Sequence, residues 1–413
     1  MKKLSLVLLI MVSAVSFFMI GCHKDLEPTY STSANGLKAI QTVDAKPIQT
    51  FAELNANVKV EDGVLVFASM KDFDNTINFL RDTSLARDAK KQEIKKWEES
   101  FPTFVSVYKY YQMARQELLA DSLNPNGFSN AKAKYGDKVH FLADETIEPV
   151  VRNGDIYGRI ISEKGQYKVG KIIIQYYKDK VISISDGNLD KLSVAMRNLK
   201  TDKAQGIYMH DLFLGQKNPN DVQLRSISPT CSNSCPVSFD QSIILDGNNT
   251  PNGETYRLTA KFDILDNGWV AGFQQDAARL IDVSIYNNIY QQRKRWWGWS
   301  ASYSTGFDWG IGWGLSLTLV SPDGITVVAP PPTCCDEGAG RPVGGQGWSQ
   351  ASELSHSITI WRFNSGSMST ADREAFYDMQ QLFCVRRISM TASSRHIDVL
   401  GNRPLTISQY CQQ

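Results

Sequence analysis

Apolar residues recur at helical spacing in the first half of the chain. Phe73, Ile77 and Leu80 lie three or four positions apart, which places them on one face of a helix. Ser69, with Asp72 three residues later, has the pattern of a helix start. The same spacing predicts further helices over residues 85–97, 103–119 and 188–199.

Strand signals accompany these helices. Asp62-Gly63 separates two runs rich in β-branched residues, which is a strong hairpin signal. Apolar runs predict three more strands, over residues 157–161, 167–177 and 181–184. Residues 51–215 are therefore predicted to form an α+β domain.

Two-residue alternation dominates the second half of the chain. Apolar positions alternate with polar ones from Tyr256 to Ile264, and with small residues from Trp309 to Leu319. Further strands are predicted over residues 355–363, 384–392 and 405–411, and a short helix from Ser369 to Gln381. Residues 237–413 are therefore predicted to form an all-β, sandwich-like domain with a short helical insertion. The proline-containing stretch 216–236 is predicted to be the linker between the two domains.

The N-terminus has the parts of a secretory signal peptide. Lys2 and Lys3 precede the uncharged, mostly apolar run Leu4–Ile20, which ends in Gly21-Cys22. A small residue followed by cysteine resembles the lipobox of bacterial lipoproteins. The resemblance implies that residues 1–21 are removed and that Cys22 carries the lipid. The alternative is an uncleaved membrane helix, for which the apolar run is at the short end of the usual length.

The segment after this cysteine, residues 22–50, is polar and lacks periodicity, which predicts a flexible tether. Its start, His23–Glu27, resembles the surface-export signal of Bacteroidota lipoproteins, and an ordinary solvated tether explains it equally well. Gly63–Phe67, Trp97-Glu98 and Val169–Tyr177 resemble core patterns of uncharacterised secreted lipoproteins from Bacteroidota. This resemblance implies a lipoprotein of the bacterial outer membrane, in either a periplasmic or a surface-exposed orientation, and implies no activity.

The chain has seven cysteines, of which all but Cys22 lie in the second half. These are Cys231, Cys235, Cys334, Cys335, Cys384 and Cys411. An even number in an exported chain predicts disulfides, although the sequence leaves their connectivity open. A metal site is the alternative, but the adjacent pair lacks the spacing of a zinc knuckle, and no histidine is near. We therefore expect disulfides, no metal and no cofactor.

Charge and motifs argue against two functions. The chain contains 44 Lys and Arg residues against 43 Asp and Glu residues, so it lacks the concentrated positive charge of nucleic-acid-binding proteins. Neither H-E-x-x-H nor G-x-S-x-G occurs, and the histidines beyond the tether stand apart in the sequence. We expect a protein that is not an enzyme and does not bind nucleic acid.

The densest group of aromatic residues follows a basic run. Trp296, Trp299 and Tyr303, with the neighbouring Arg295, are candidate ligand-binding residues, because exposed aromatic rings can stack on the apolar faces of sugars. Trp296 is the best candidate for an exposed ring, since consecutive tryptophans on a strand face opposite sides. The alternative is that the tryptophans are core residues, as we predict for Trp313 on an apolar strand face.

These observations predict a lipid-anchored, non-catalytic protein of the cell envelope that binds a glycan or a protein partner. Two alternatives stay open. The first is a structural or adhesive lipoprotein without a small-molecule site. The second is a glycan-acting hydrolase, which needs only two suitably placed carboxylates.

Overall fold

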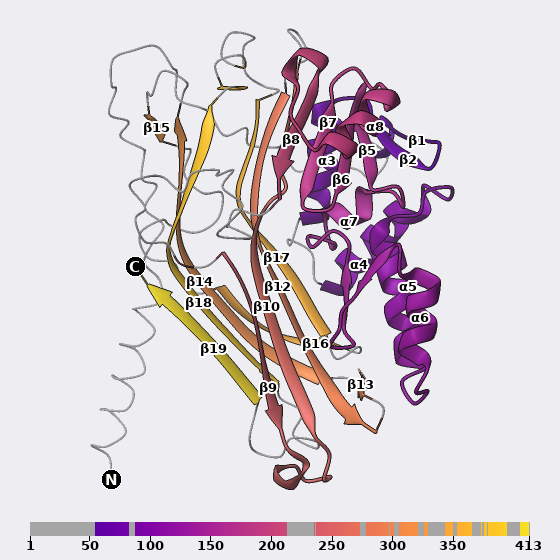
Figure 1. Ribbon diagram of the computed structural model, residues 1–413, viewed down its shortest axis with the longest axis vertical. Helices are drawn as coiled ribbons and strands as arrows, with labels where there is room; N and C mark the ends of the chain where they lie inside the picture. The colour runs from indigo at the N-terminus through magenta and orange to yellow at the C-terminus, as the bar shows by residue number, and fades with distance from the viewer. Residues whose placement is uncertain are drawn as a thin grey trace, which may run out of the picture. The chain divides into compact units, whose positions relative to one another are not determined.

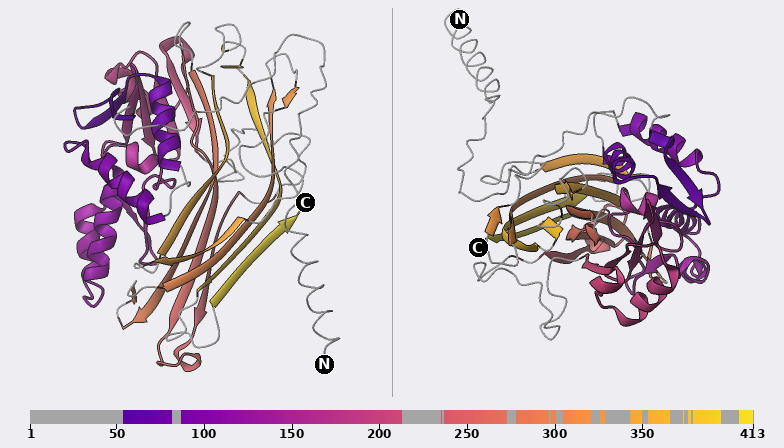
Figure 2. Two further views of the ribbon diagram at one scale, coloured as in Figure 1. Left: turned by 180° about the vertical axis from the view of Figure 1, so that it is seen from behind. Right: turned by 90° about the horizontal axis from the view of Figure 1, so that it is seen from above.

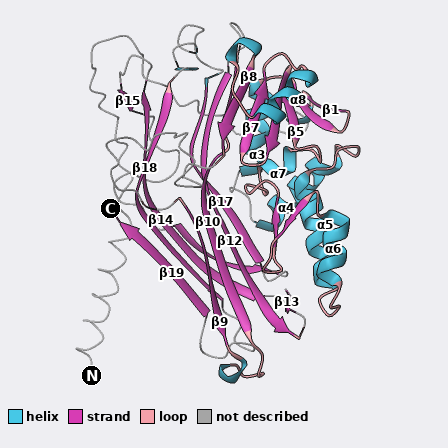
Figure 3. Ribbon diagram, viewed as in Figure 1, coloured by secondary structure: helices cyan, strands magenta, loops and turns pink. Residues whose placement is uncertain are grey.

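The computed structural model describes residues 54–81, 87–212, 235, 237–272, 278–296, 298–300, 305–320, 326–328, 343–349, 353–365, 373, 376–377, 379–394 and 405–412. This part of the chain is β-rich, with few helices and with strands grouped into several sheets (Figure 3). It belongs to one compact unit, residues 41–413. The predicted signal peptide, Cys22 and the predicted tether lie outside the described residues, as does almost all of the predicted linker.

Six strands between residues 58 and 211 form one sheet (Figure 1). In sheet order they are β1 (Val58–Glu61), β2 (Val64–Phe67), β5 (Gln166–Val169), β6 (Ile172–Tyr177), β7 (Lys180–Ile184) and β8 (Ile207–Asp211). The predicted β1–β2 hairpin is confirmed, and its turn residues Asp62 and Gly63 have φ angles of 52° and 76°. Positive φ at both turn positions is typical of two-residue hairpins. The β2–β5 pair is parallel, and the other pairs are antiparallel.

The helices in the same part of the chain include the four that the sequence predicts and two that it does not, over residues 127–135 and 157–160. They are α3 (Met70–Arg81), α4 (Arg87–Glu99), α5 (Val107–Ala120), α6 (Gly127–Tyr135), α7 (Tyr157–Ile160) and α8 (Leu189–Asn198). Phe73, Ile77 and Leu80 of α3 are buried in one core with Trp97 of α4. Asn188 caps α8 by accepting a hydrogen bond from the Asp190 N–H at 2.8 Å, so this helix begins where the sequence predicts it.

Two predicted strands have a different structure. The first, over residues 157–161, contains the helix α7. Tyr157 and Ile160 are fully buried at positions i and i+3, the spacing of one helix face, and Ile161 follows the helix in an extended conformation and is also buried. The second, over residues 167–177, is the β5–β6 hairpin, because Gly170 adopts a φ of 56° and turns the chain.

The second half of the chain forms two large antiparallel sheets. The first contains β11 (Trp269–Ala271), β12 (Ala278–Arg295), β10 (Tyr256–Asp266) and β9 (Ser238–Leu245), with β13 (Gly298–Ser300) and β17 (Glu353–Asn364) also paired to β12. The second contains β15 (Thr326–Val328), β14 (Thr305–Val320), β18 (Gln380–Ser394) and β19 (Leu405–Gln412), with β16 (Val343–Ser349) paired to β14. Figure 2 shows the long strands of the two sheets alongside each other. A separate two-stranded sheet consists of β3 (Val139–Phe141) and β4 (Ile147–Pro149).

The predicted strands of the second half are confirmed, and the predicted short helix is confirmed only in part. Arg373, Phe376 and Tyr377 are helical, whereas Gln380 and Gln381 already belong to β18. The strand therefore starts earlier than predicted, because these two residues pair with the end of β14. The remaining residues of the predicted helix before Gln380, apart from Met379, lie outside the described residues.

Strand β10 is buried on both faces, although its residues alternate between apolar and polar. Lys261 and Asp263 on the polar face are only 6% and 1% exposed. The Lys261 ammonium lies 2.6 Å from the carboxylate of Glu148 in β4, and Asp263 forms an ion pair with Arg152. The polar face of β10 is thus covered by residues from the first half of the chain, which supply opposite charges.

A second buried charge cluster surrounds Asp282 of β12. Arg81 donates to both carboxylate oxygens of Asp282, at 2.7 and 2.6 Å, and the hydroxyl of Tyr157 donates at 2.7 Å. Arg362 of β17 pairs with Asp282 and also with Asp74 of α3. Helices α3 and α7 are therefore tied to strands β12 and β17 by charge-assisted hydrogen bonds.

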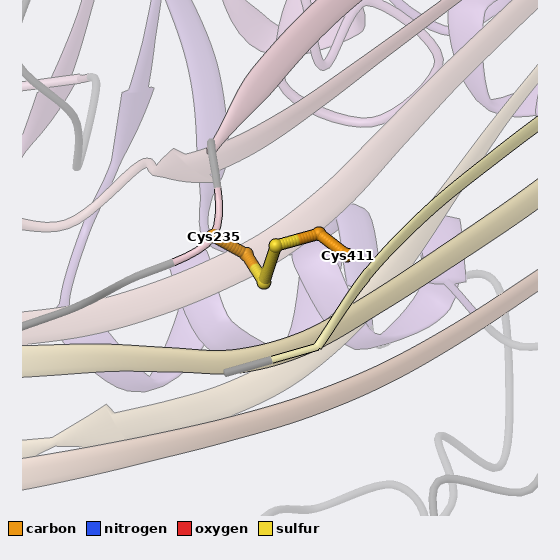
Figure 4. The surroundings of a disulfide bond; sticks show 2 residues. All are labelled: Cys235 and Cys411. Atoms are coloured by element: carbon orange, nitrogen blue, oxygen red, sulfur yellow. A yellow bond between two sulfur atoms is a disulfide. The ribbon is translucent and has the colours of Figure 1, made fainter.

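One disulfide is present in the described part of the chain, between Cys235 and Cys411 (Figure 4). It joins the start of the second half to the last strand, across a sequence separation of 176 residues. Cys384 belongs to β18. Cys231, Cys334 and Cys335 lie outside the described residues, so the pairing of the other four cysteines stays a prediction.

Replacing both cysteines of this bridge, Cys235→Ser with Cys411→Ser, is expected to lower the free energy of unfolding by about 2–4 kcal/mol, because the unfolded chain gains the entropy that the cross-link removes. Denaturant titration of the mutant and the native protein measures this difference. Peptide mapping without reduction should recover Cys235 and Cys411 in one linked peptide. Free thiols at both positions in the native protein would contradict the assignment.

Candidate functional site

The aromatic cluster lies where β12 turns into β13. Across this hairpin Lys294 pairs with Trp299 and Arg295 pairs with Gly298. Trp296 occupies the turn, and its side chain is 84% exposed. Burying large apolar side chains is a main source of folding free energy, so a tryptophan exposed to this degree is a candidate for ligand contact.

Trp299 is half-buried beside two cations. The guanidinium carbon of Arg257 lies 4.5 Å from the centroid of its indole ring, and the ammonium of Lys294 lies 5.1 Å from it. Both distances are within the range of cation–π attraction. Arg257 is fixed because its Nε donates to Gln292 Oε1 at 3.0 Å and its Nη2 donates to the carbonyl of Asp144 at 2.6 Å.

The β3–β4 turn brings two carboxylates to the hairpin. Glu145 accepts a hydrogen bond from the backbone N–H of Trp299, and Asp144 Oδ1 accepts one from the N–H of Thr146 at 3.1 Å. Glu145 has a φ of 65°, a strained conformation for a residue other than glycine. Gly298 lies opposite with a φ of 150°, which favours glycine, and a Cβ there would require the Glu145 carboxylate to move.

A cavity of about 500 Å³ opens between the hairpin and the turn, and we refer to it as the outer cavity. Its walls carry two indole rings and two pairs of opposite charges: Trp296, Trp299, Asp144, Glu145, Arg257 and Lys294. It thus combines apolar ring faces with hydrogen-bond donors and acceptors in a depression that is largely open to solvent.

A second cavity of about 270 Å³, the inner cavity, shares Glu145 and Trp299 with the first. Its other walls include apolar and polar side chains from α5, the α5–α6 loop, α6, β4 and β12, among them Leu119, Phe128, Ile147, Asn124, Tyr290 and Gln292. Burial raises the pKa of the Tyr290 hydroxyl to about 12, although Lys261 lowers it in part. This hydroxyl is therefore protonated at neutral pH and can donate a hydrogen bond.

The structure places the predicted site residues as follows. Trp296 and Trp299 line the outer cavity. The Nε of Arg295 donates to Ser300 Oγ at 3.3 Å across the hairpin, so this residue supports the turn that carries Trp296. Tyr303 lies outside the described residues. Trp313 is 5% exposed and belongs to the core, as predicted.

Sequence inspection misses Asp144, Glu145 and Arg257. Glu145 lies 154 positions before its hydrogen-bond partner Trp299, and Asp144 lies 113 positions before Arg257. Acidic residues in a short turn are usually solvated, and no local spacing links these two to the tryptophans. The signal that the sequence does contain is the glycine at position 298, which follows two tryptophans and makes room for the carboxylate.

Two kinds of feature do not occur in the described part of the chain. Its His, Cys, Asp and Glu side chains nowhere gather in groups of three or more that could hold a metal ion. None of its helices has the length and apolar character needed to cross a membrane.

Comparison with known proteins adds little. No family model matches the sequence, and no curated protein matches it. Among solved structures, the chain is similar to a DUF4848 family protein from Bacteroides thetaiotaomicron, with 12% sequence identity over 86% of this chain and 100% of that chain. The TM-score is 0.26, which is too low to show a shared fold.

Proposed function

We propose that this protein is a glycan-binding lipoprotein of the cell envelope, with its ligand in the outer cavity. The observation that carries the proposal is a tryptophan, Trp296, that is 84% exposed and forms a wall of a cavity with a second indole ring. The C–H face of a sugar ring can stack on such an indole, and this contact removes apolar surface from water.

The polar walls of the outer cavity suit the hydroxyl groups of a sugar. Arg257 and Lys294 can donate hydrogen bonds, and Asp144 and Glu145 can accept them. Arg257 is held by hydrogen bonds to Gln292 and to the carbonyl of Asp144, so its guanidinium keeps its position without a ligand. A preorganised wall lowers the entropy lost on binding.

Binding without catalysis is the better proposal for the two carboxylates. Glu145 accepts a hydrogen bond from the Trp299 N–H, and Asp144 accepts hydrogen bonds from the backbone and the hydroxyl of Thr146 at 3.1 and 2.5 Å. Glu145 therefore ties the turn to the hairpin, and Asp144 stabilises the turn itself. We infer that they position Trp299 and contact hydroxyl groups, and that they do not act as an acid–base pair.

Trp296→Ala is expected to weaken glycan binding about tenfold or more, because aromatic side chains at the centre of a site are frequent hot spots. It should leave the melting temperature nearly unchanged, since exposed substitutions usually alter stability by no more than about 0.5 kcal/mol. The assay is a glycan array of the purified full chain, followed by calorimetric titration with the best-bound glycan.

Tyr410→Ala is the matched control, because Tyr410 is also a large exposed ring, at 57%, and lies on β19 outside both cavities. The proposal expects the control to bind like the native protein. Equal loss of binding in both variants, or retention of binding in Trp296→Ala, would show that the outer cavity is not the glycan-binding site. An array without any bound glycan, together with capture of a protein partner that depends on Trp296, would favour protein recognition instead.

The proposal also covers the layout of the chain. We take the two large sheets as a sandwich-like, all-β domain over residues 237–413. Residues 51–215 are then the α+β domain, and residues 216–236 connect the two. Cys22 is proposed to carry the lipid, with residues 22–50 as the tether, which would hold the binding cavity away from the surface of the outer membrane.

Cys22→Ser is expected to block lipidation and to release most of the protein from the membrane fraction, because several acyl chains on one residue give stable anchoring that a polar tether cannot replace. Fractionation after a high-salt wash, with immunoblotting, measures the shift. Cys235→Ser is the comparison: it breaks the disulfide and lowers stability but keeps the proposed anchor, so it should stay in the membrane fraction. A Cys22→Ser protein that stays in the washed membranes would contradict the anchor.

A further inference from the structure

The inner cavity has the size and lining of a small ligand site. Its volume of about 270 Å³ is near the lower end of the range for small-molecule pockets. Phe128 and Ile147 supply apolar surface, whereas Asn124, Tyr290 and Gln292 supply hydrogen-bonding groups. Such a mixture fits a compact polyhydroxylated ring better than a purely apolar ligand.

The polar groups of this cavity are positioned by other contacts of the fold. Asn124 donates to Asp121 Oδ2 at 3.1 Å and accepts from the N–H of Asn126 at 3.0 Å, which fixes its amide. Tyr290 is only 6% exposed, and its hydroxyl lies 3.4 Å from Thr146 Oγ1. This long contact leaves the hydroxyl able to form a shorter hydrogen bond to a ligand.

The two cavities are neighbours that share a wall. Glu145 and Trp299 line both of them, and Gln292 of the inner cavity accepts the hydrogen bond that fixes Arg257 in the outer one. A ligand in one cavity therefore lies beside the side chains that form the other. Two adjacent, differently lined cavities are the arrangement expected for consecutive units of one chain.

We infer that the inner cavity is a second subsite for the glycan of the outer cavity, so that the ligand is an oligosaccharide spanning both cavities past Trp299. This inference rests on the proposed glycan binding. One sugar residue occupies the inner cavity between Phe128 and the amides of Asn124 and Gln292, and the next residues extend through the outer cavity to Trp296. The two halves of the chain thus recognise one ligand together.

The test is the dependence of affinity on ligand length. The probe is a ladder of one to six sugar residues, prepared by partial acid hydrolysis of the polysaccharide that the full chain binds best on the array. Connecting two subsites should make the longer oligosaccharides bind at least about tenfold more tightly than the monosaccharide, because the second contact is intramolecular. The affinity should stop rising with ligand length once both cavities are filled.

Two variants separate this inference from the proposed function. Ser122→Phe fills the inner cavity, and Tyr290→Phe removes one donor from it while keeping the ring. Both variants should reduce the increase of affinity with ligand length and keep the contact at Trp296. Trp296→Ala should instead weaken binding of the long ligands by removing the contact in the outer cavity. Native affinities that do not rise with length, or a full gain in both variants at unchanged melting temperature, would overturn the second subsite alone. An array without any bound glycan would overturn the proposed function and this inference together.

Discussion

Asp282→Asn is expected to destabilise the protein by about 3–5 kcal/mol, the usual cost of breaking a buried ion pair by removing one partner. Asp282 is fully buried, and the side chain of Arg81 is only 14% exposed, so the substitution leaves that guanidinium without its carboxylate. Arg362 keeps Asp74 as a partner, so the main cost falls on the unpaired charge of Arg81. Urea unfolding followed by circular dichroism measures the change.

Asp186→Asn is the matched control, because Asp186 pairs with Lys191 at 2.5 Å on the surface, with the two side chains 40% and 27% exposed. An exposed pair of this kind contributes at most about 1 kcal/mol. A loss at Asp282 no larger than the loss at Asp186 would show that the buried cluster does not stabilise the fold.

The same cluster predicts how stability depends on pH. Burial raises the pKa of Asp282, but the charges of Arg81 and Arg362 outweigh burial and hold it below the ordinary value of 3.8. A carboxyl whose pKa is lower in the folded state adds stability above pH 3.8, and this stability is lost as the pH falls through the native pKa. The stability difference between native and Asp282→Asn proteins should therefore shrink in acid.

Trp313→Ala is the second large effect, and it is expected to cost about 3–5 kcal/mol, as truncation of a buried tryptophan usually does. Trp313 is 5% exposed on the apolar face of β14, opposite Ile388 of β18, and its neighbours Ile311 and Leu315 on the same face are also buried. The substitution leaves a cavity on the buried face of the sheet, which the surrounding structure fills only in part. Thermal and urea unfolding measure the loss.

Trp296→Ala provides the comparison, since it removes the same side chain from an exposed position. We expect a large loss of stability at Trp313 and a small one at Trp296. Similar losses at the two positions would mean that Trp296 is a packing residue, and the proposed binding surface would then lose its main support.

Much of the local structure is predictable because it depends on residues close in sequence. The Asp62-Gly63 hairpin, the α3 face of Phe73, Ile77 and Leu80, and the long alternation of β14 all follow from periods of two or 3.6 residues. The β-rich character of the second half follows from the same signal.

Predictions fail where tertiary contacts decide the conformation. The turn of helix at Tyr157 has the composition of a strand, and burial of Tyr157 and Ile160 on one helix face decides against extended structure. The β3–β4 hairpin is too short to have a periodic signal, and it gains partners from strands far along the chain. One of these contacts is the hydrogen bond from Arg257 to the carbonyl of Asp144.

The candidate site divides in the same way. Alternation along a strand predicts the exposed ring at Trp296, but the ring is exposed because Trp296 lies in the turn after β12. The sequence does not predict the carboxylates of the β3–β4 turn as site residues, nor the inner cavity. Both arise when residues from the two halves of the chain come together. The cation–π contacts of Trp299 likewise need Arg257 from another strand.

The most direct test of the central claim is a footprint of Trp296 with and without glycan. Hydroxyl-radical oxidation of the full chain, quantified by peptide mass spectrometry, reports how accessible each side chain is. The account predicts that a saturating concentration of the best-bound glycan slows oxidation of Trp296 several-fold and leaves oxidation of Tyr410 unchanged. Oxidation of Trp296 at the same rate with the glycan bound would contradict the claim that its ring forms the binding surface.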